Sequence, residues 1–295
     1  MPRTTARTLR WVIRLVAVTL VALLAAALHR ARERARDVPL SPVAAGWFVG
    51  PNFVHRAGLV AEDPTSIDGE LDDVGTLAGD TFDPDRLDPE VRRFYERTGA
   101  YDLRYRTRWH PPFRTGAALA TRVTSRIEQL NLPGPDDESW HRLESRFLDV
   151  EEPGADEKAA PEQPVREDVR AWVRTNPVTG EAVFVALYAT HHRGGDGFVN
   201  ITVPLPGGGI DTVLRPVNLD RGDGEGTGVR FTTYGTGDPG LYLRTPVGAL
   251  ELPAEQEFEV WREAEDGDRT GLRGTHEMWL LGRRLLTVEY GIERA

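Results

Sequence analysis

A single long apolar run restricts where the N-terminal part of this chain can reside. Residues 11–28 (WVIRLVAVTLVALLAAAL) are apolar except for Arg14 and one threonine, and arginines lie on both sides of the run. A helix rises about 1.5 Å per residue, whereas the hydrocarbon core of a bilayer is about 30 Å thick. The uncharged part, residues 15–28, is therefore about 21 Å long, and the run approaches the thickness of a bilayer only when it includes Arg14.

The position of Arg14 is compatible with a membrane helix. Side chains of a helix tilt toward its N-terminus, so the guanidinium of Arg14 can extend back to the lipid headgroups beside Trp11. We therefore interpret residues 1–37 as a basic N-terminus with a single-pass membrane anchor, whose apolar core begins at Leu15 and ends at Leu28. The lipid bilayer is the first partner that the sequence predicts.

The alternative interpretation of this segment is a cleaved signal peptide. Such a peptide has a basic start, a short apolar core and small residues before the cleavage site, and residues 25–27 are three alanines. However, the arginine-dense stretch 29–36 is unusual directly after a cleavage site. The orientation of a retained anchor stays open, because four arginines lie on each side of the apolar core and the positive-inside rule gives no preference.

The charge of the remaining chain argues against a nucleic-acid partner. From Val38 onward there are 28 basic and 44 acidic residues, which gives a formal net charge of −16. Such a surface repels phosphate groups. Lys158 is the only lysine, and with the acidic excess this composition resembles proteins of salt-loving archaea. The chain has no cysteine, which excludes disulfides, thiol nucleophiles and thiolate metal sites.

Residues 38–88 are rich in Pro, Gly, Asp and Glu and show little periodicity, so we expect an acidic, solvated linker there. Its aromatic residues Trp47, Phe48 and Phe53 are exceptions that can pack on a domain or enter a membrane interface. A single β-rich domain, residues 89–295, is expected to follow.

Two helices and one strand are predicted at the start of this domain. Asp88 precedes Pro89 and an acidic first turn, a pattern that begins a helix over 89–98. Tyr101, Leu103 and Tyr105 then alternate with charged residues, as in a half-buried strand. A second helix is expected over 116–130, with Leu119, Val123, Ile127 and Leu130 on one face. Residues 131–164 are predicted to be mostly loop, with one helical turn at 139–147.

From Val165 onward the apolar residues alternate with period two, and turn sequences separate the segments. This pattern predicts eight or nine sequential antiparallel strands, the last two joined by a tight hairpin at Gly282 and Arg283. No βαβ alternation is present, which excludes a parallel nucleotide-binding sheet. We predict an α+β, mainly β fold: an N-terminal membrane helix, then a curved antiparallel meander or barrel with two short helices, analogous to the calycins.

Two short elements carry a resemblance to other proteins. The chain contains Phe94-Tyr95-Glu96-Arg97-Thr98 and Gln129-Leu130-Asn131-Leu132-Pro133. These are similar to Phe-Tyr-Glu-x-Thr and Gln-Leu-Asn-x-Pro elements of an uncharacterised prokaryotic family, in which no activity is known. From the residues alone, Phe94 and Tyr95 are expected to pack a helix against the domain, and Asn131 with Pro133 to end a helix.

The sequence offers few candidates for catalysis. The densest polar group is His191, His192 and Asp196, at the point where a strand enters a turn. Adjacent strand residues point to opposite faces, so the two histidines cannot readily bind one metal ion. No serine lies in a nucleophile elbow, and no phosphate-binding loop or cofactor motif is present. We therefore expect no cofactor and no metal site.

Three functions remain compatible with the sequence. The first is a membrane-tethered binding module whose barrel encloses an apolar or amphipathic ligand, with a cavity formed by Trp172, Phe184, Tyr188, Phe231 and Trp279. The second is a structural or assembly protein at the membrane. The third is a membrane-associated enzyme centred on the His191, His192 and Asp196 segment.

Overall fold

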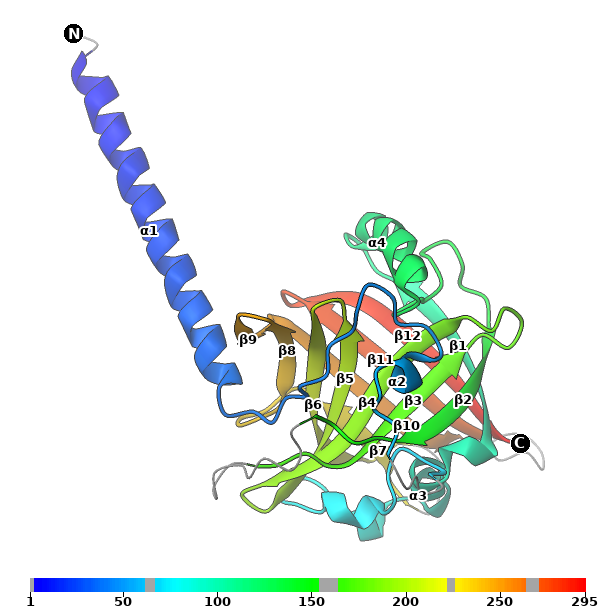
Figure 1. Ribbon diagram of the computed structural model, residues 1–295. Coiled ribbons are helices and arrows are strands. Elements are labelled where there is room, and N and C mark those ends of the chain that lie inside the picture. The colour runs from blue at the N-terminus through cyan, green and yellow to red at the C-terminus, as the bar shows by residue number, and fades with distance from the viewer. Residues whose placement is uncertain (1–2, 62–66, 154–163, 222–225, 264–270) are drawn as a thin grey trace.

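The computed structural model describes residues 3–61, 67–153, 164–221, 226–263 and 271–295. It consists of a long N-terminal helix, α1 (Arg3–Ala35), and a β-barrel that contacts the C-terminal end of this helix (Figure 1). Within the described residues, α1 is the one helix that is long and apolar enough to cross a membrane, and the protein does not bury its apolar part. The helix has the properties of the single-pass anchor that the sequence predicts.

The barrel is a ten-stranded antiparallel meander in which neighbours in the chain are neighbours in the sheet. Around the barrel the order is β1-β2-β3-β4-β5-β6-β7-β10-β11-β12, and β12 pairs with β1 to close it. These strands are β1 (Tyr101–Trp109), β2 (His141–Asp149), β3 (Glu167–Thr175), β4 (Ala182–Arg193), β5 (Asp196–Leu205), β6 (Gly208–Leu219), β7 (Gly228–Thr232), β10 (Ala254–Glu263), β11 (Gly271–Leu280) and β12 (Arg283–Arg294). The predicted fold class, a mainly β meander or barrel after a membrane helix, is confirmed.

A hairpin of two further strands leaves the barrel next to α1. β7 and β8 (Gly240–Thr245) pair with successive parts of β6, and β8 then turns back to pair with β9 (Gly248–Glu251). The last turn of α1 rests on this hairpin, where Arg34 Nε donates to the Glu251 carboxylate at 3.2 Å. The four-residue strand β9 is too short to show the alternation by which the other strands were predicted.

Alternation decides which side chains enter the barrel. In β1 the side chains of Tyr101, Leu103 and Tyr105 are buried, whereas Asp102 and Arg104 are exposed. β4 and β5 differ, because almost all of their residues are buried. The wall that these two strands form with β3 is therefore covered on both faces.

The segment expected to be a solvated linker covers that wall and one end of the barrel. Val49, Val54 and Leu59 pack on the outer face of β3 and β4. Residues 67–88 instead enter the core of the barrel, where Val74 and Leu77 are at most 1% exposed. The expectation of a spacer was wrong for these residues, because scattered apolar side chains without a period can still fill a surface that the sheet provides. Residues 62–66 lie outside the described residues.

The first short helix agrees with the sequence. α3 (Pro89–Glu96) begins at the expected cap, since the Asp88 carboxylate accepts a hydrogen bond of 2.8 Å from the backbone N–H of Glu90. Val91, Phe94 and Tyr95 are its buried residues. The remaining short helical segments are α2 (Phe53–Arg56) and the 3-10 turns η1 (Val74–Leu77), η2 (Pro84–Arg86) and η3 (Thr98–Ala100).

The second helix, α4 (Arg114–Ile127), ends where a glutamine enters the sheet. The fully buried side chain of Gln129 donates to the carbonyl oxygens of Val185 (2.7 Å) and Pro204 (3.2 Å), and its own oxygen accepts from the Val185 N–H at 3.0 Å. Pro204 has no N–H to donate. The Gln129 amide thus bridges β4 and β5 beyond their last paired residues, which gives the Gln129–Pro133 element a structural role.

Two local predictions were wrong. Residues 141–149 form strand β2 rather than a helical turn. Every second residue of this strand faces the interior, and Leu143 and Phe147 on this face pack against the barrel core. The last hairpin turns at Leu281 and Gly282, one residue earlier than expected, and both have positive φ (52° and 71°). A two-residue turn with both φ positive matches the twist of the flanking strands, although leucine is rare there.

The burial of residues 67–88 can be tested by a single substitution. Leu77→Ala removes a fully buried side chain, and such changes cost about 2–5 kcal/mol of unfolding free energy. We expect a clearly lower denaturation midpoint for the full chain in detergent. Val178→Ala, at a side chain that is 90% exposed, serves as control. Equal midpoints for Leu77→Ala and the unaltered chain would show that this segment is only a linker.

Candidate functional site

A narrow cavity of about 70 Å³ lies inside the barrel, above α3. Most of its wall is apolar, including the side chains of Leu103, Ile201 and Phe231. A buried water needs at least about 10–15 Å³, so this volume suits about five waters or a ligand of a few non-hydrogen atoms. Typical sites for drug-sized ligands are about 300–1,000 Å³. Side chains therefore fill most of the barrel interior.

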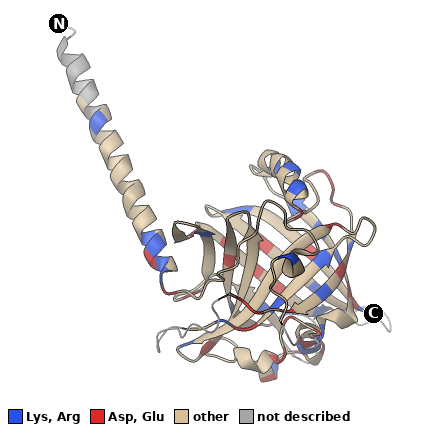
Figure 2. Cartoon of the chain, viewed as in Figure 1, with Lys and Arg blue, Asp and Glu red and all other residues tan. Residues whose placement is uncertain are grey.

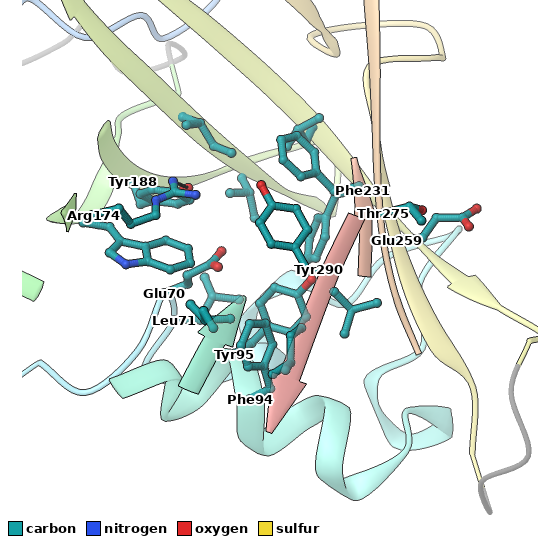
Figure 3. A pocket seen from close by; sticks show the side chains of 18 of the residues that line it. Glu70, Leu71, Phe94, Tyr95, Arg174, Tyr188, Phe231, Glu259, Thr275 and Tyr290 are labelled. Atoms are coloured by element: carbon teal, nitrogen blue, oxygen red, sulfur yellow. Dashed lines mark hydrogen bonds between the residues drawn. The ribbon is translucent and has the colours of Figure 1, made fainter. Parts of the chain in front are cut away.

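Strand β3 contributes two polar side chains to the cavity wall, Trp172 and Arg174, which lie two residues apart on its inward face. Figure 3 shows Arg174 beside Tyr188. The guanidinium carbon of Arg174 is 3.9 Å from the ring centroid of Trp172 and 4.4 Å from that of Phe184. Its Nη2 donates to the hydroxyl of Tyr188 at 2.7 Å. Stacking between two aromatic rings stabilises a buried cation and fixes its orientation.

Both of these residues retain a donor without a protein partner. Arg174 Nε and Trp172 Nε1 are buried, and no described residue accepts a hydrogen bond from either atom. The side chains themselves are almost fully buried, since Arg174 is 8% and Trp172 5% exposed. A buried donor without an acceptor costs about 1–3 kcal/mol. Two residues of the cavity wall therefore carry a buried donor that has no protein acceptor among the described residues.

One carboxyl group faces the same space. Glu70, in the segment before η1, lines the cavity, and burial raises its pKa to about 7 against the opposing effect of the Arg174 and Arg170 charges. Near neutral pH this carboxyl group is thus divided between its protonated and ionised forms. Glu70 and Arg174 both line the cavity, and no hydrogen bond joins their side chains.

The phenols around the cavity remain neutral. Burial raises the pKa of Tyr95, from α3, and of Tyr290, from β12, and the negative charge of Glu70 adds to this effect. Further along the interior, burial and then the Arg174 charge lower the pKa of His276 to about 3. Around the cavity, Arg174 therefore stays charged at all ordinary pH values, whereas Glu70 changes its charge near neutral pH.

The structure brings together some of the predicted cavity residues. Trp172, Tyr188 and Phe231 line the cavity, and Phe184 packs on Arg174. Trp279 does not line it and instead lies 6.3 Å from the ring of Tyr234. Sequence reasoning missed Arg174 and Glu70. The alternation of β3 places position 174 on the same face as Trp172, so Arg174 could have been found, whereas Glu70 lies in an aperiodic segment without any such signal.

The weak catalytic candidates lie apart and away from the cavity. His191 is fully buried on the outer side of the wall, and its Nε2 is 2.9 Å from the Asp238 carboxylate. The Nε2 of His192 is 2.7 Å from the Thr76 carbonyl oxygen. Asp196 accepts from the backbone N–H of Asp80 at 2.9 Å. Each group has its own structural partner, and among the described residues no cluster of three or more His, Asp or Glu suits a metal ion.

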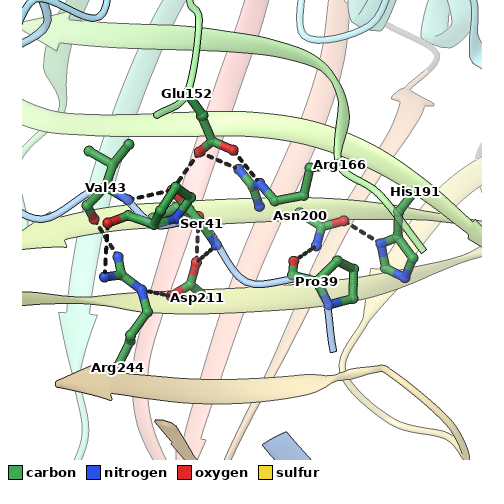
Figure 4. Close-up of polar contacts among 11 residues, drawn as sticks. Pro39, Ser41, Val43, Glu152, Arg166, His191, Asn200, Asp211 and Arg244 are labelled. Carbon is green, nitrogen blue, oxygen red and sulfur yellow. Dashed lines mark hydrogen bonds and ion pairs between the residues drawn. The ribbon is translucent and has the colours of Figure 1, made fainter. Parts of the chain in front are cut away.

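His191 belongs to a polar network that attaches residues 37–45 to the barrel (Figure 4). Asn200 donates to the carbonyl oxygen of Pro39 at 3.0 Å, so its amide oxygen faces Nδ1 of His191. Asp211 accepts from the backbone N–H of Ser41 at 3.1 Å. The network holds the chain that follows α1 in one position, which is a structural role.

A larger hollow of about 590 Å³ lies on the outer face of β1, β12, β11 and β10. Its arginines are paired with glutamates, as Arg273 is with Glu263 (2.6 Å) and Arg221 with Glu259 (2.9 Å). The hollow therefore carries little uncompensated charge, in contrast to the interior cavity.

The anchor residues lie along α1. Trp11, Leu15 and Leu28 are exposed by 66%, 70% and 42%. The guanidinium carbon of Arg14 is 5.9 Å from the Trp11 ring centroid, on the N-terminal side where a headgroup contact was expected.

Comparison with known proteins identifies one described relative and no activity. The chain is 32% identical over 244 residues to the "Uncharacterized membrane protein YndJ" of Bacillus subtilis (strain 168). The similar region covers 83% of this chain but only 41% of the relative. No protein family model and no solved structure matches the chain. The similarity supports a relationship to an uncharacterised prokaryotic membrane protein, and with α1 it identifies this protein as anchored in a membrane by a single span.

The pKa of Glu70 predicts a dependence of stability on pH. An unfolded glutamate titrates near 4.5 and the folded carboxyl near 7, so the folded state binds this proton more tightly and loses stability as pH rises from about 4.5 to about 7. His276 acts in the opposite direction, because its folded pKa lies below the usual 6.5. Glu70→Gln removes only the effect of Glu70. We therefore expect the melting temperature of the variant minus that of the unaltered chain to be larger at about pH 8 than at about pH 5.

Thermal unfolding of both proteins at these two pH values measures the difference. Asp85→Asn, at an exposed carboxylate, is the matched control and should leave the difference near zero. A Glu70→Gln profile parallel to that of the unaltered chain would contradict the assignment of a buried, titrating carboxyl.

Proposed function

We propose that this protein is a membrane-anchored binding module whose barrel holds a small amphipathic molecule. The head group of this molecule accepts hydrogen bonds from Arg174 and Trp172, and its short apolar part contacts the surrounding side chains. The observation that carries the proposal is the pair of buried donors, Arg174 Nε and Trp172 Nε1, that no described residue satisfies. Binding sites of this kind are mostly apolar with a few convergent polar groups.

The cavity limits the class of ligand. Its volume of about 70 Å³ excludes a complete lipid chain without rearrangement of the interior. The fixed charge of Arg174 favours an anionic head group, such as a carboxylate, over a neutral one. Glu70 competes with such an anion when ionised, so binding is expected to be tighter below about pH 7, where Glu70 is protonated.

The second candidate function is a structural or assembly protein at the membrane. It is favoured by the small size of the cavity and by the dense packing of residues 38–61 on the outer wall. An enzyme centred on His191, His192 and Asp196 has less support, because these groups have separate partners and share no cavity.

The proposal can be tested with straight-chain carboxylic acids of increasing length, from propanoate to octanoate, and the corresponding alcohols. A ligand that binds only the folded state stabilises it by RT ln(1 + [L]/Kd), so thermal unfolding of the full chain in detergent reports binding. We expect the short acids to raise the melting temperature more than the alcohols do. Arg174→Met keeps an unbranched side chain in the core and should abolish the preference for acids.

The matched control is Arg142→Met, which removes an exposed arginine from the outer face of β2. This variant should respond like the unaltered chain. If no acid or alcohol stabilises the protein, or if Arg174→Met responds like Arg142→Met, the cavity is not the proposed site and the structural role is favoured instead.

A further inference from the structure

Helix α4 exposes its apolar stripe to solvent. Leu119 and Val123, one turn apart on the face predicted to be apolar, are 64% and 57% exposed. Only the small side chain of Ala117 is fully buried within the helix. A helix that packs through an alanine and leaves its larger apolar residues outside has an unused contact surface.

Two aromatic residues lie at the C-terminal end of this helix. The backbone N–H of Val49 donates to the Ile127 carbonyl oxygen at 2.8 Å, which fixes residues 47–50 against α4. The neighbouring side chains of Trp47 and Phe48 are 89% and 44% exposed. We refer to Leu119, Val123, Trp47 and Phe48 as the α4 patch.

The charge of α4 is the opposite of that of the domain that carries it. The helix contains three arginines and no acidic residue, although the chain from Val38 onward has a formal net charge of −16. Arg122 and Arg126 are exposed, and no carboxylate of a described residue lies within ion-pair distance of either. In Figure 2 the helix α4 carries blue bands and no red one.

The position of α4 relative to the anchor adds a geometric argument. α1 extends from one side of the barrel, and α4 lies at the end of the barrel that faces the same side (Figure 1). The base of α1 is fixed to the barrel, because Arg34 contacts Glu251 (3.2 Å) and the Gly237 carbonyl oxygen (2.9 Å). A bilayer that holds α1 would therefore lie over α4.

We propose that the α4 patch enters the headgroup region of the same bilayer in which α1 is anchored. Exposed leucine, valine and tryptophan beside arginines form the pattern of an interfacial amphipathic helix. Arginines that lack a protein carboxylate can bind anionic lipid headgroups, and this interaction fixes the tilt of the barrel relative to the membrane. The proposal does not depend on the ligand proposed for the barrel cavity.

The absence of cysteine from the sequence permits a direct test by site-specific spin labelling. Leu119→Cys, Val18→Cys and Arg93→Cys each receive one nitroxide label in the full chain, reconstituted into vesicles of phosphatidylcholine and phosphatidylglycerol. Val18, in the apolar part of α1, reports insertion, and the exposed Arg93, on α3 at the opposite end of the barrel, reports water. Collision rates with oxygen and with a water-soluble nickel complex give the depth of each label.

We expect the label at Leu119 to favour oxygen over nickel, as the label at Val18 does, whereas the label at Arg93 favours nickel. Replacing Arg122 and Arg126 by glutamine should weaken the contact about fivefold for each arginine in these anionic vesicles. A Leu119 label as accessible to nickel as the Arg93 label, in vesicles where Val18 is inserted, would overturn the proposal and leave the patch free for a protein partner.

Discussion

The pairing of the first barrel strand with the last is the constraint on which the rest of the structure depends. β1 pairs with β12 over its whole length, from Tyr101 opposite Arg294 to Trp109 opposite Leu286. This ladder closes the ten-stranded meander, pairs its first and last strands and creates an interior that side chains must fill. In the closed barrel every second residue of a strand faces inward, and on β3 these residues include Trp172 and Arg174. The segment before β1 then has to cover one open end, which explains why acidic residues 67–88 contain fully buried apolar side chains.

The interior combines dense apolar packing with two buried donors that no described residue satisfies, Arg174 Nε and Trp172 Nε1. A buried guanidinium is costly unless it is paired and hydrogen-bonded. Arg174 is stabilised by the rings of Trp172 and Phe184 and by the Tyr188 hydroxyl, yet its Nε lacks an acceptor. Polar groups without a partner are rare in native cores, and the ligand proposed above would supply an acceptor for these two donors. Under this proposal, the carboxyl group of Glu70, whose pKa burial raises to about 7, links occupation of the site to pH.

Most of the fold could be predicted from the sequence because alternation and turns are local signals. They gave the meander, the strands from Val165 onward and the cap of α3 at Asp88. They failed where long-range packing decides the outcome: β2 was read as a helical turn, and residues 38–88 as a linker. Of the aromatic residues that line the cavity, Trp172, Tyr188 and Phe231 were predicted, whereas Phe94, Tyr95, Phe258 and Tyr290 were not, and the predicted Trp279 lies elsewhere. Glu70 could not be predicted, because its burial results from barrel closure by residues far away in the chain.

An experimental structure of the full chain, purified in mild detergent at about pH 6, tests the central claim most directly. The account predicts density for a small non-protein molecule in the barrel, with one acceptor within hydrogen-bond distance of Arg174 Nε and Trp172 Nε1. It also predicts that the wall strands keep the arrangement described above. Ordered water molecules alone at both nitrogen atoms, with no organic molecule bound, would contradict the account and identify the interior as a purely structural core.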